Sequence, residues 1–317
     1  MGNARSGLAA LTAMVALAGV ALAGCGARPR GVDGDLTNDW PAFPKATTPV
    51  PKVGVCYPAD FNETWYGDFS SANDCTKDSH QTETVYVGTF TGADADRSAP
   101  PLASSAARRA AYDECQKAGT DYLGGPWQSA KVDLGLVLPD DKAWTGGARW
   151  YRCDLIQYQD SGYETVKTTG SAKDGLQGTR PLAVTCLIFT DDGKKSVTGT
   201  EDIDCTKPHN GEFVGLFTAP DRPWQADKEA RRKIAADGCS AVVAHFLGYP
   251  GNIPYSNYLA TSWTSFVQEQ WSLGDRTVRC FALAFNGTSA NNQRIVGSVK
   301  GLKGGAPPQG LTKLSKG

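Results

Sequence analysis

The sequence has almost no excess charge and few of the residues that most often carry catalysis. Its 317 residues have a formal net charge of −1 at pH 7, so composition gives no reason to expect a nucleic-acid partner. Only three histidines occur. The Gly-x-Ser-x-Gly, His-Glu-x-x-His, P-loop and dinucleotide-binding signatures are all absent. We therefore expect a protein without a catalytic residue, a bound metal or a cofactor.

Long apolar runs are also scarce, and the clearest one lies near the beginning of the sequence. Residues 8–22 are apolar and rich in alanine, but the run is too short for a convincing membrane span. This pattern predicts a signal peptide over residues 1–24. It ends in Leu-Ala-Gly-Cys, which resembles the lipobox of bacterial lipoproteins and implies that Cys25 is lipidated; ordinary secretion is the alternative. Residues 25–51 are rich in Pro and Gly and are expected to form a tether from the membrane.

No cysteine is left over once Cys25 is set aside, so we expect no free nucleophilic thiol. Eight cysteines remain, and an even number in an exported chain favours disulfides. They form two sets of four, and the first gap is 19 residues in both. We expect two bridges within each set and none between the sets. Each set allows three pairings; because the first and fourth cysteines lie in strand-like runs, we predict Cys56–Cys153, Cys75–Cys115, Cys186–Cys280 and Cys205–Cys239.

The two cysteine sets belong to a stretch that the chain contains twice. Asp-Cys-Thr-Lys, followed by His, two residues and Glu, occurs at 74–83 and again at 204–212, each time before a strand-like run. Trp-x-x-Gly-x-Arg precedes the fourth cysteine of both sets. The pattern predicts two tandem domains, repeat 1 over residues 52–178 and repeat 2 over residues 181–305, and then a flexible basic tail over residues 306–317.

Strand-like runs outnumber helices in both repeats, which indicates the α+β class: an antiparallel-rich sheet with one helix in each small, disulfide-stapled domain. Apolar periodicity and turn residues locate the elements. In repeat 1 we expect strands over 53–57, 85–90, 132–138 and 152–156, and a helix over 103–117 that stops at Gly119. In repeat 2 we expect strands over 182–189 and 213–217 and a helix over 226–239.

This order of motifs resembles the septum formation domain family, which consists of exported or membrane-anchored actinobacterial proteins, in two tandem copies. The match is clearest in repeat 2, where Cys205, Pro208, His209 and Glu212 fit the pattern. In repeat 1 two residues replace the single proline. The resemblance implies a link to cell division and partners among envelope or division proteins. It specifies no reaction.

The repeated stretch supplies two candidate pairs for metal binding or proton transfer, His80 with Glu83 and His209 with Glu212. A catalytic zinc needs three protein ligands, however, and no other His or free Cys is near in sequence. A spacing of three residues in an extended segment also points two side chains to opposite faces. We favour the alternative, in which His bonds to the backbone of the loop and Glu faces solvent or pairs with Arg.

Arginines and aromatic residues are the remaining candidates. Arg276, like Arg149, Arg152 and Arg279, suits either an anionic ligand or an internal pair with Glu83 or Glu212, and we favour the internal pair. Trp263 and Trp271 belong to an aromatic cluster that suits a sugar, a peptide or a protein surface, with core packing as the alternative. The cluster also contains Tyr249, Tyr255, Tyr258 and Phe266.

These features predict a lipid-anchored protein on the extracytoplasmic face of the cell membrane that acts by binding rather than catalysis. Its expected partners are other envelope or division proteins. A module that binds a cell-wall glycan or peptide through the aromatic residues is the alternative. A metal-dependent hydrolase built on His209 and Glu212 is a third and weaker hypothesis.

Overall fold

The computed structural model describes residues 47–58, 72–159, 165–193, 197–249, 259–285 and 289–302. The expected signal peptide, Cys25, nearly all of the expected tether and the expected tail lie outside these residues. The chain divides into two units, Met1–Thr47 and Thr48–Gly317, and every element described below belongs to the second unit. No helix among the described residues has the length and apolar character needed to cross a bilayer.

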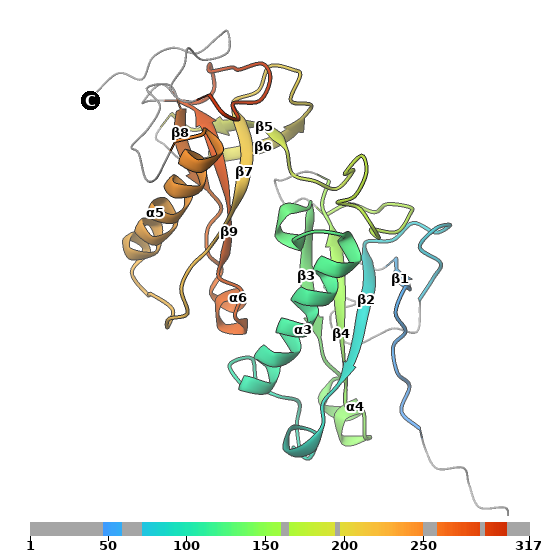
Figure 1. Cartoon of the computed structure of the whole chain (residues 1–317). Coiled ribbons are helices and arrows are strands. Elements are labelled where there is room, and N and C mark those ends of the chain that lie inside the picture. The colour runs from blue at the N-terminus through green and yellow to red at the C-terminus, as the bar shows by residue number, and fades with distance from the viewer. Residues whose placement is uncertain are drawn as a thin grey trace, which may run out of the picture. The chain divides into compact units, whose positions relative to one another are not determined.

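Repeat 1 forms a four-stranded antiparallel sheet in the order β1-β2-β4-β3 (Figure 1). The long helix α3 connects β2 to β3 and packs on one face of the sheet. Tyr112, Cys115 and Leu123 of this helix are buried together with Leu134 and Leu155 of the strands. The bounds are β1 Cys56–Tyr57, β2 Thr82–Thr89, η1 Gly92–Asp94, α3 Ala106–Leu123, η2 Trp127–Ser129, β3 Val132–Val137, α4 Asp141–Thr145 and β4 Trp150–Gln157.

Repeat 2 forms a five-stranded antiparallel sheet in the order β6-β5-β7-β9-β8. Helix α5 packs on β7, β8 and β9, as α3 does on the corresponding strands of repeat 1 (Figure 1). Strand β6, which has no described counterpart in repeat 1, was not predicted. The bounds are β5 Cys186–Asp191, β6 Val197–Ile203, β7 Gly211–Thr218, α5 Lys228–Phe246, β8 Leu259–Trp263, α6 Gln268–Leu273 and β9 Thr277–Ala284.

The two sheets agree in small irregularities as well as in strand order. The pairing of β2 with β4 shifts register between Thr84 and Tyr86, and that of β7 with β9 shifts between Phe213 and Gly215. These bulges lie at corresponding places, shortly after the conserved-in-both-copies Glu of each repeat, because the two stretches have the same length from Glu to bulge. The predicted α+β class, with antiparallel sheets and few helices, is confirmed.

Both long helices continue beyond their predicted ends. Helix α3 passes through Gly119 and ends at Gly124, which has the left-handed backbone (φ 77°) that favours glycine at a helix end. Helix α5 passes through Gly238 and ends at Phe246. Each internal glycine faces the sheet, where the helix approaches apolar side chains: Leu134 for Gly119 and the Phe217 ring for Gly238. Tertiary packing therefore explains glycines that local sequence suggested were helix stops.

The predicted disulfide pairing is wrong, although the expectation of two bridges within each repeat and none between them is confirmed. The bridges join first to second and third to fourth cysteine. Strand β2 lies between β1 and β4, which carry the first and fourth cysteines. Two strand spacings separate Cα atoms by roughly 9–10 Å, whereas a disulfide spans at most about 7 Å. The bridges are Cys56–Cys75, Cys115–Cys153, Cys186–Cys205 and Cys239–Cys280.

The two helical glycines give a matched test of this packing. Gly238→Ala is expected to lower the free energy of unfolding by about 1–3 kcal/mol, because its new methyl group would overlap the Phe217 ring. Gly119→Ala is the control: its Cβ would lie 3.4 Å from Leu134 Cδ1, an ordinary contact, and alanine favours the helix by up to ~1 kcal/mol. Urea denaturation measures both. Equal losses in the two variants would contradict this account.

Candidate functional site

The two candidate histidines are buried and bonded to the backbone. In each repeat the segment around His forms an antiparallel bridge with a closing segment, His80 with Thr168 and His209 with Ile295. The ring atom Nδ1 lies 3.0 Å from the carbonyl of Asp78 in repeat 1, and 2.8 Å from the corresponding carbonyl in repeat 2. A carbonyl only accepts, so Nδ1 carries the proton and donates. The expected backbone contact of His is therefore confirmed.

The two glutamates are buried as well, which corrects the expectation that they face solvent or pair with Arg. Glu83 accepts hydrogen bonds from the hydroxyls of Tyr122 (2.5 Å) and Ser171 (2.6 Å) and from the amide of Ala172 (2.7 Å). Burial, and then the bond to this carboxylate, raises the pKa of Tyr122 to about 12. The carboxylate is satisfied by neutral donors, so it needs no arginine.

Glu212 has the same surroundings in repeat 2. It accepts from the Ser298 hydroxyl (2.5 Å) and from the Val299 amide (2.8 Å). We call each set the His–Glu clasp: His80 and Glu83 with residues 168–172, and His209 and Glu212 with residues 295–299. Each clasp fastens the end of its repeat to the start of a central strand.

The described residues contain one group of three possible metal ligands, and its chemistry does not suit a metal. Atoms of Cys56, His80 and Glu83 lie within 4.8 Å of one another, so the expectation that His and Glu point to opposite faces is wrong in repeat 1. His80 precedes β2, so the alternation of an extended strand does not apply between it and Glu83. Cys56 is in a disulfide and supplies no thiolate, and Glu83 already accepts three hydrogen bonds. The hypothesis of a metal-dependent hydrolase gains no support here.

The four arginines are bound internally, but none pairs with Glu83 or Glu212, so that part of the prediction is wrong. Arg276 forms an ion pair with Asp221 (2.9 Å). The others make the following contacts: Arg152 with Asp154 at 2.8 Å, Arg149 with the carbonyls of Ala95, Trp144 and Ala148, and Arg279 with the carbonyls of Gln128 and Ala130 at 2.6 and 2.7 Å.

The aromatic cluster splits into different environments. Trp271 is buried, packs edge-on against Phe266 and Trp224, and donates from Nε1 to the carbonyl of Arg222 at 2.9 Å. Core packing therefore describes Trp271. Tyr255 and Tyr258 lie outside the described residues. Trp263, on β8, is only partly buried and borders a groove.

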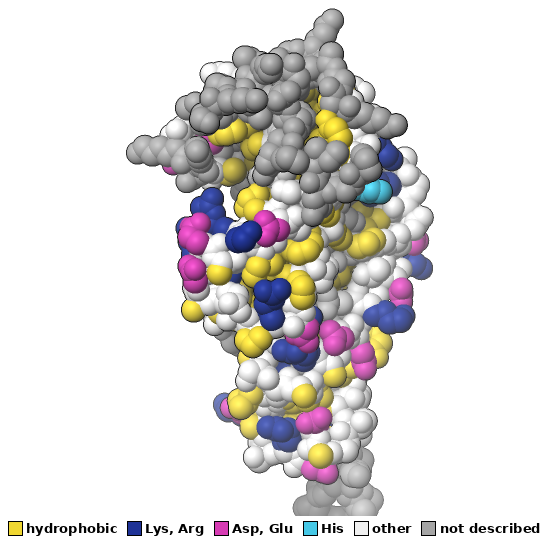
Figure 2. Space-filling model, turned by 60° about the vertical axis from the view of Figure 1, so that its left-hand side comes forward, with side chains coloured by type: hydrophobic (Ala, Val, Ile, Leu, Met, Phe, Trp, Pro, Cys, Tyr) yellow, Lys and Arg dark blue, Asp and Glu magenta, His cyan; other side chains and the backbone are white. Residues whose placement is uncertain are grey.

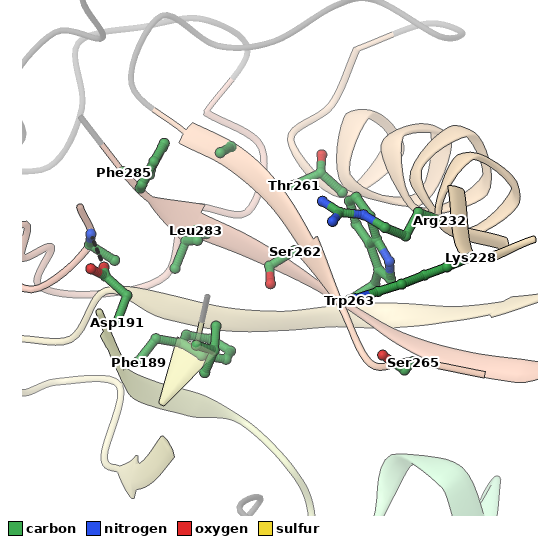
Figure 3. A pocket seen from close by; sticks show the side chains of 13 residues that line it. Phe189, Asp191, Lys228, Arg232, Thr261, Ser262, Trp263, Ser265, Leu283 and Phe285 are labelled. Atoms are coloured by element: carbon green, nitrogen blue, oxygen red, sulfur yellow. Dashed lines mark hydrogen bonds between the residues drawn. The ribbon is translucent and has the colours of Figure 1, made fainter. Parts of the chain in front are cut away.

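This groove, which we call the β8 groove, has a volume of about 450 Å³ and follows β8 (Figure 3). Trp263 pairs with Cys280, whose sulfur is bonded to α5, so the Trp263 and Thr261 side chains lie on the α5 side of the sheet. Ser262 lies on the other side, with Phe189 and Leu283. The groove thus includes surface from both sides of one strand.

Two basic side chains line the α5 side of the groove. Lys228 and Arg232 are one turn apart at the beginning of α5. Lys228 has no ion-pair partner among the described residues, and Arg232 Nε is 3.9 Å from the exposed Glu229, a loose surface pair. Figure 2 shows basic and acidic side chains interspersed over a broad face, so any attraction for anions is local to such a groove.

The acidic residue of the groove is already used. Asp191 accepts hydrogen bonds from the Ala290 amide (2.6 Å), the Ser289 hydroxyl (3.0 Å) and the Gly193 amide (2.8 Å). Its charge is therefore compensated within the protein. The groove offers a partner two cations, apolar surface and hydroxyl groups.

Sequence reasoning singled out Trp263 but missed Lys228, Arg232 and strand β8. A signal for the basic pair was present, because residues four apart on a predicted helix share a face. The strand was indicated only indirectly, by its correspondence with the predicted strand over 132–138 in repeat 1.

The His–Glu clasp yields a test of its structural role. Glu212→Gln is expected to lower the free energy of unfolding by about 1–3 kcal/mol, because the amide group cannot accept from both Ser298 and Val299. Glu229→Gln, at an exposed position, is the control and should change it by less than about 0.5 kcal/mol. Denaturant unfolding, with hydrogen exchange of residues 295–302, measures the effect. An unchanged stability in Glu212→Gln would remove the clasp from the account.

Comparison with known proteins gives a family but no described relative. The sequence model described as Septum formation matches residues 53–280 in a single match that includes parts of both repeats. None of the curated proteins and none of the solved structures compared with the chain matches it. Since the match covers well over half of the sequence, the chain belongs to the septum formation family.

Proposed function

We propose that the protein is a lipid-anchored binding protein on the extracytoplasmic face of the cell membrane, and that it contributes to septum formation by holding another envelope or division protein. Family membership supports the link to septum formation. Four disulfides support an extracytoplasmic location, because such bonds persist in oxidising compartments. The Leu-Ala-Gly-Cys sequence ending at Cys25 supports the lipid anchor.

The observation that carries the binding role is the β8 groove. The His and Glu residues that suggested chemistry are buried and hydrogen-bonded in the clasps, whereas Trp263, Lys228 and Arg232 border an open groove. A site made of an aromatic ring, apolar surface and unneutralised cations suits recognition, and it contains no arrangement of nucleophile and base. We therefore propose binding and no catalysis.

We further propose that the chain arose by tandem duplication of one unit in an actinobacterial lineage. The equivalent sheet orders, register shifts and disulfide separations of the two repeats support the duplication. The unit is then one half of the segment that the family match covers.

A cell-wall glycan is the second candidate ligand. Trp263 with the hydroxyls of Thr261 and Ser262 is the observation in its favour, because sugars stack on aromatic rings and bond to hydroxyl groups. The two candidates differ in what the protein should capture from isolated envelopes.

The lipid anchor is tested by Cys25→Ser. The variant is expected to lose its acyl chains, each of which contributes ~0.8 kcal/mol of membrane affinity per buried CH₂. It should leave the detergent phase on phase partitioning and either enter the medium or remain as uncleaved precursor. Partitioning identical to that of the wild type would show that Cys25 is not the anchor.

The binding role is tested by Trp263→Ala, with Trp224→Ala as the matched control in the same repeat but outside the groove. Full-length protein is crosslinked in cells and its partners are compared by mass spectrometry, alongside sedimentation with purified peptidoglycan. Loss of about ten-fold or more in capture of a protein partner by Trp263→Ala alone is expected, because central aromatic residues dominate interfaces. Selective loss of peptidoglycan sedimentation would favour the glycan, and no difference between the variants would reject the groove.

A further inference from the structure

Strand β8 is the edge of the second sheet, and its outward backbone groups can be identified. The amide of Thr264 donates to the carbonyl of Arg279 on β9 (3.1 Å), so Ser262, two residues earlier, also directs its backbone groups at β9. In an antiparallel pair these directions alternate. The N–H and C=O groups of Thr261 and Trp263 therefore point away from the sheet. No strand of the described chain pairs with that side.

Such an edge is a template for an added strand. Unpaired N–H and C=O groups along an edge can pair with an extended peptide, and pockets on the two faces then receive its alternate side chains. The β8 groove has this form, because it extends over both faces of the strand (Figure 3). One face presents Phe189 and Leu283, and the other presents Trp263 beside Lys228 and Arg232.

The corresponding edge of the first sheet is not equally open. The guanidinium of Arg279 donates to the carbonyls of Gln128, Ala130 and Val132, at the beginning of β3 (2.6, 2.7 and 3.4 Å). An internal contact thus occupies the start of that edge. At β8 the cations of α5 border the edge without forming such bonds within the described chain.

We propose that the β8 groove binds an extended acidic peptide segment of a protein partner, which adds as a further strand beside β8. This inference rests on the proposed binding function and names its ligand class. The backbone of Thr261 and Trp263 supplies the pairing groups. Lys228 and Arg232 select acidic side chains on the α5 side, and Phe189 with Leu283 receives apolar side chains on the other side.

The test uses the full-length protein in detergent and three labelled, capped peptides of about ten residues. The first alternates Val and Glu, the second alternates Val and Lys, and the third is the Val–Glu peptide with N-methyl groups on alternate amides. Fluorescence anisotropy at pH 7 gives the affinities. The Val–Glu peptide should bind about ten-fold or more tightly than the Val–Lys peptide, and less tightly as salt is added. N-methylation should weaken binding by a similar factor, because it blocks strand pairing.

Two variants separate charge selection from backbone pairing. Lys228→Glu combined with Arg232→Glu should reverse the preference toward the Val–Lys peptide, whereas Lys233→Glu, on the same helix but outside the groove, should not. Thr261→Pro removes an outward N–H group without removing a bond to β9, so it should weaken peptide binding while the melting temperature stays within a few degrees of the wild type.

Equal affinity for the acidic and basic peptides, full binding of the N-methylated peptide, or no peptide binding at all would overturn the inference. These outcomes leave the proposed function separately testable. If no peptide binds but Trp263→Ala still abolishes capture of an envelope component, only strand addition fails. If Trp263→Ala changes no capture either, the binding function of the groove fails too.

Discussion

A buried carboxylate at the start of each central strand holds the ends of its repeat together. Glu83 and Glu212 accept bonds from a serine hydroxyl and a backbone amide of the closing segment, 88 to 89 residues on for Glu83 and 86 to 87 residues on for Glu212. Bonds to a charged acceptor contribute about 1.5–3 kcal/mol each, and an unmade one leaves a buried charge. The strand, the closing segment and the adjacent first disulfide thus depend on one another.

This constraint explains why the most conspicuous motif in the chain is structural. His and Glu drew attention as chemistry because both side chains bind metals and transfer protons. In each repeat the proton on His Nδ1 goes to a backbone carbonyl, and the Glu oxygens face donors of the closing segment. A short closing sequence, Gly-Ser-x-Lys, is the partner that the first motif requires. The two motifs recur together because they contact each other.

Much of the fold was predictable from the sequence because it depends on local pattern. The strands over 132–138 and 152–156 and both long helices follow from apolar spacing, and their limits differ by a few residues from prediction. Strand order is not a local property, and the disulfide prediction failed for that reason: nothing near Cys56 or Cys153 shows that β2 lies between them. Likewise the burial of Glu83 depends on residues that are distant in sequence. For the candidate site, Trp263 was predictable by type, but its position on an edge strand beside α5 was not.

Small differences between the repeats give the two sheet edges different surroundings. In repeat 1 the buried Arg152 has a carboxylate two residues on, Asp154, and the two form an ion pair. In repeat 2 the corresponding positions are Arg279 and Phe281, so the arginine has no such partner beside it. It donates instead to carbonyls at the beginning of β3, where a buried guanidinium finds acceptors. A single replacement of Asp by Phe thus joins repeat 2 to the edge region of repeat 1. It also adds an apolar ring beside Phe189, which packs edge-on against Phe281 on the groove side of the second sheet. The same substitution therefore contributes to the internal contact at β3 and to the apolar surface beside β8, which gives a physical reason for two similar repeats to have unequal capacity for a partner.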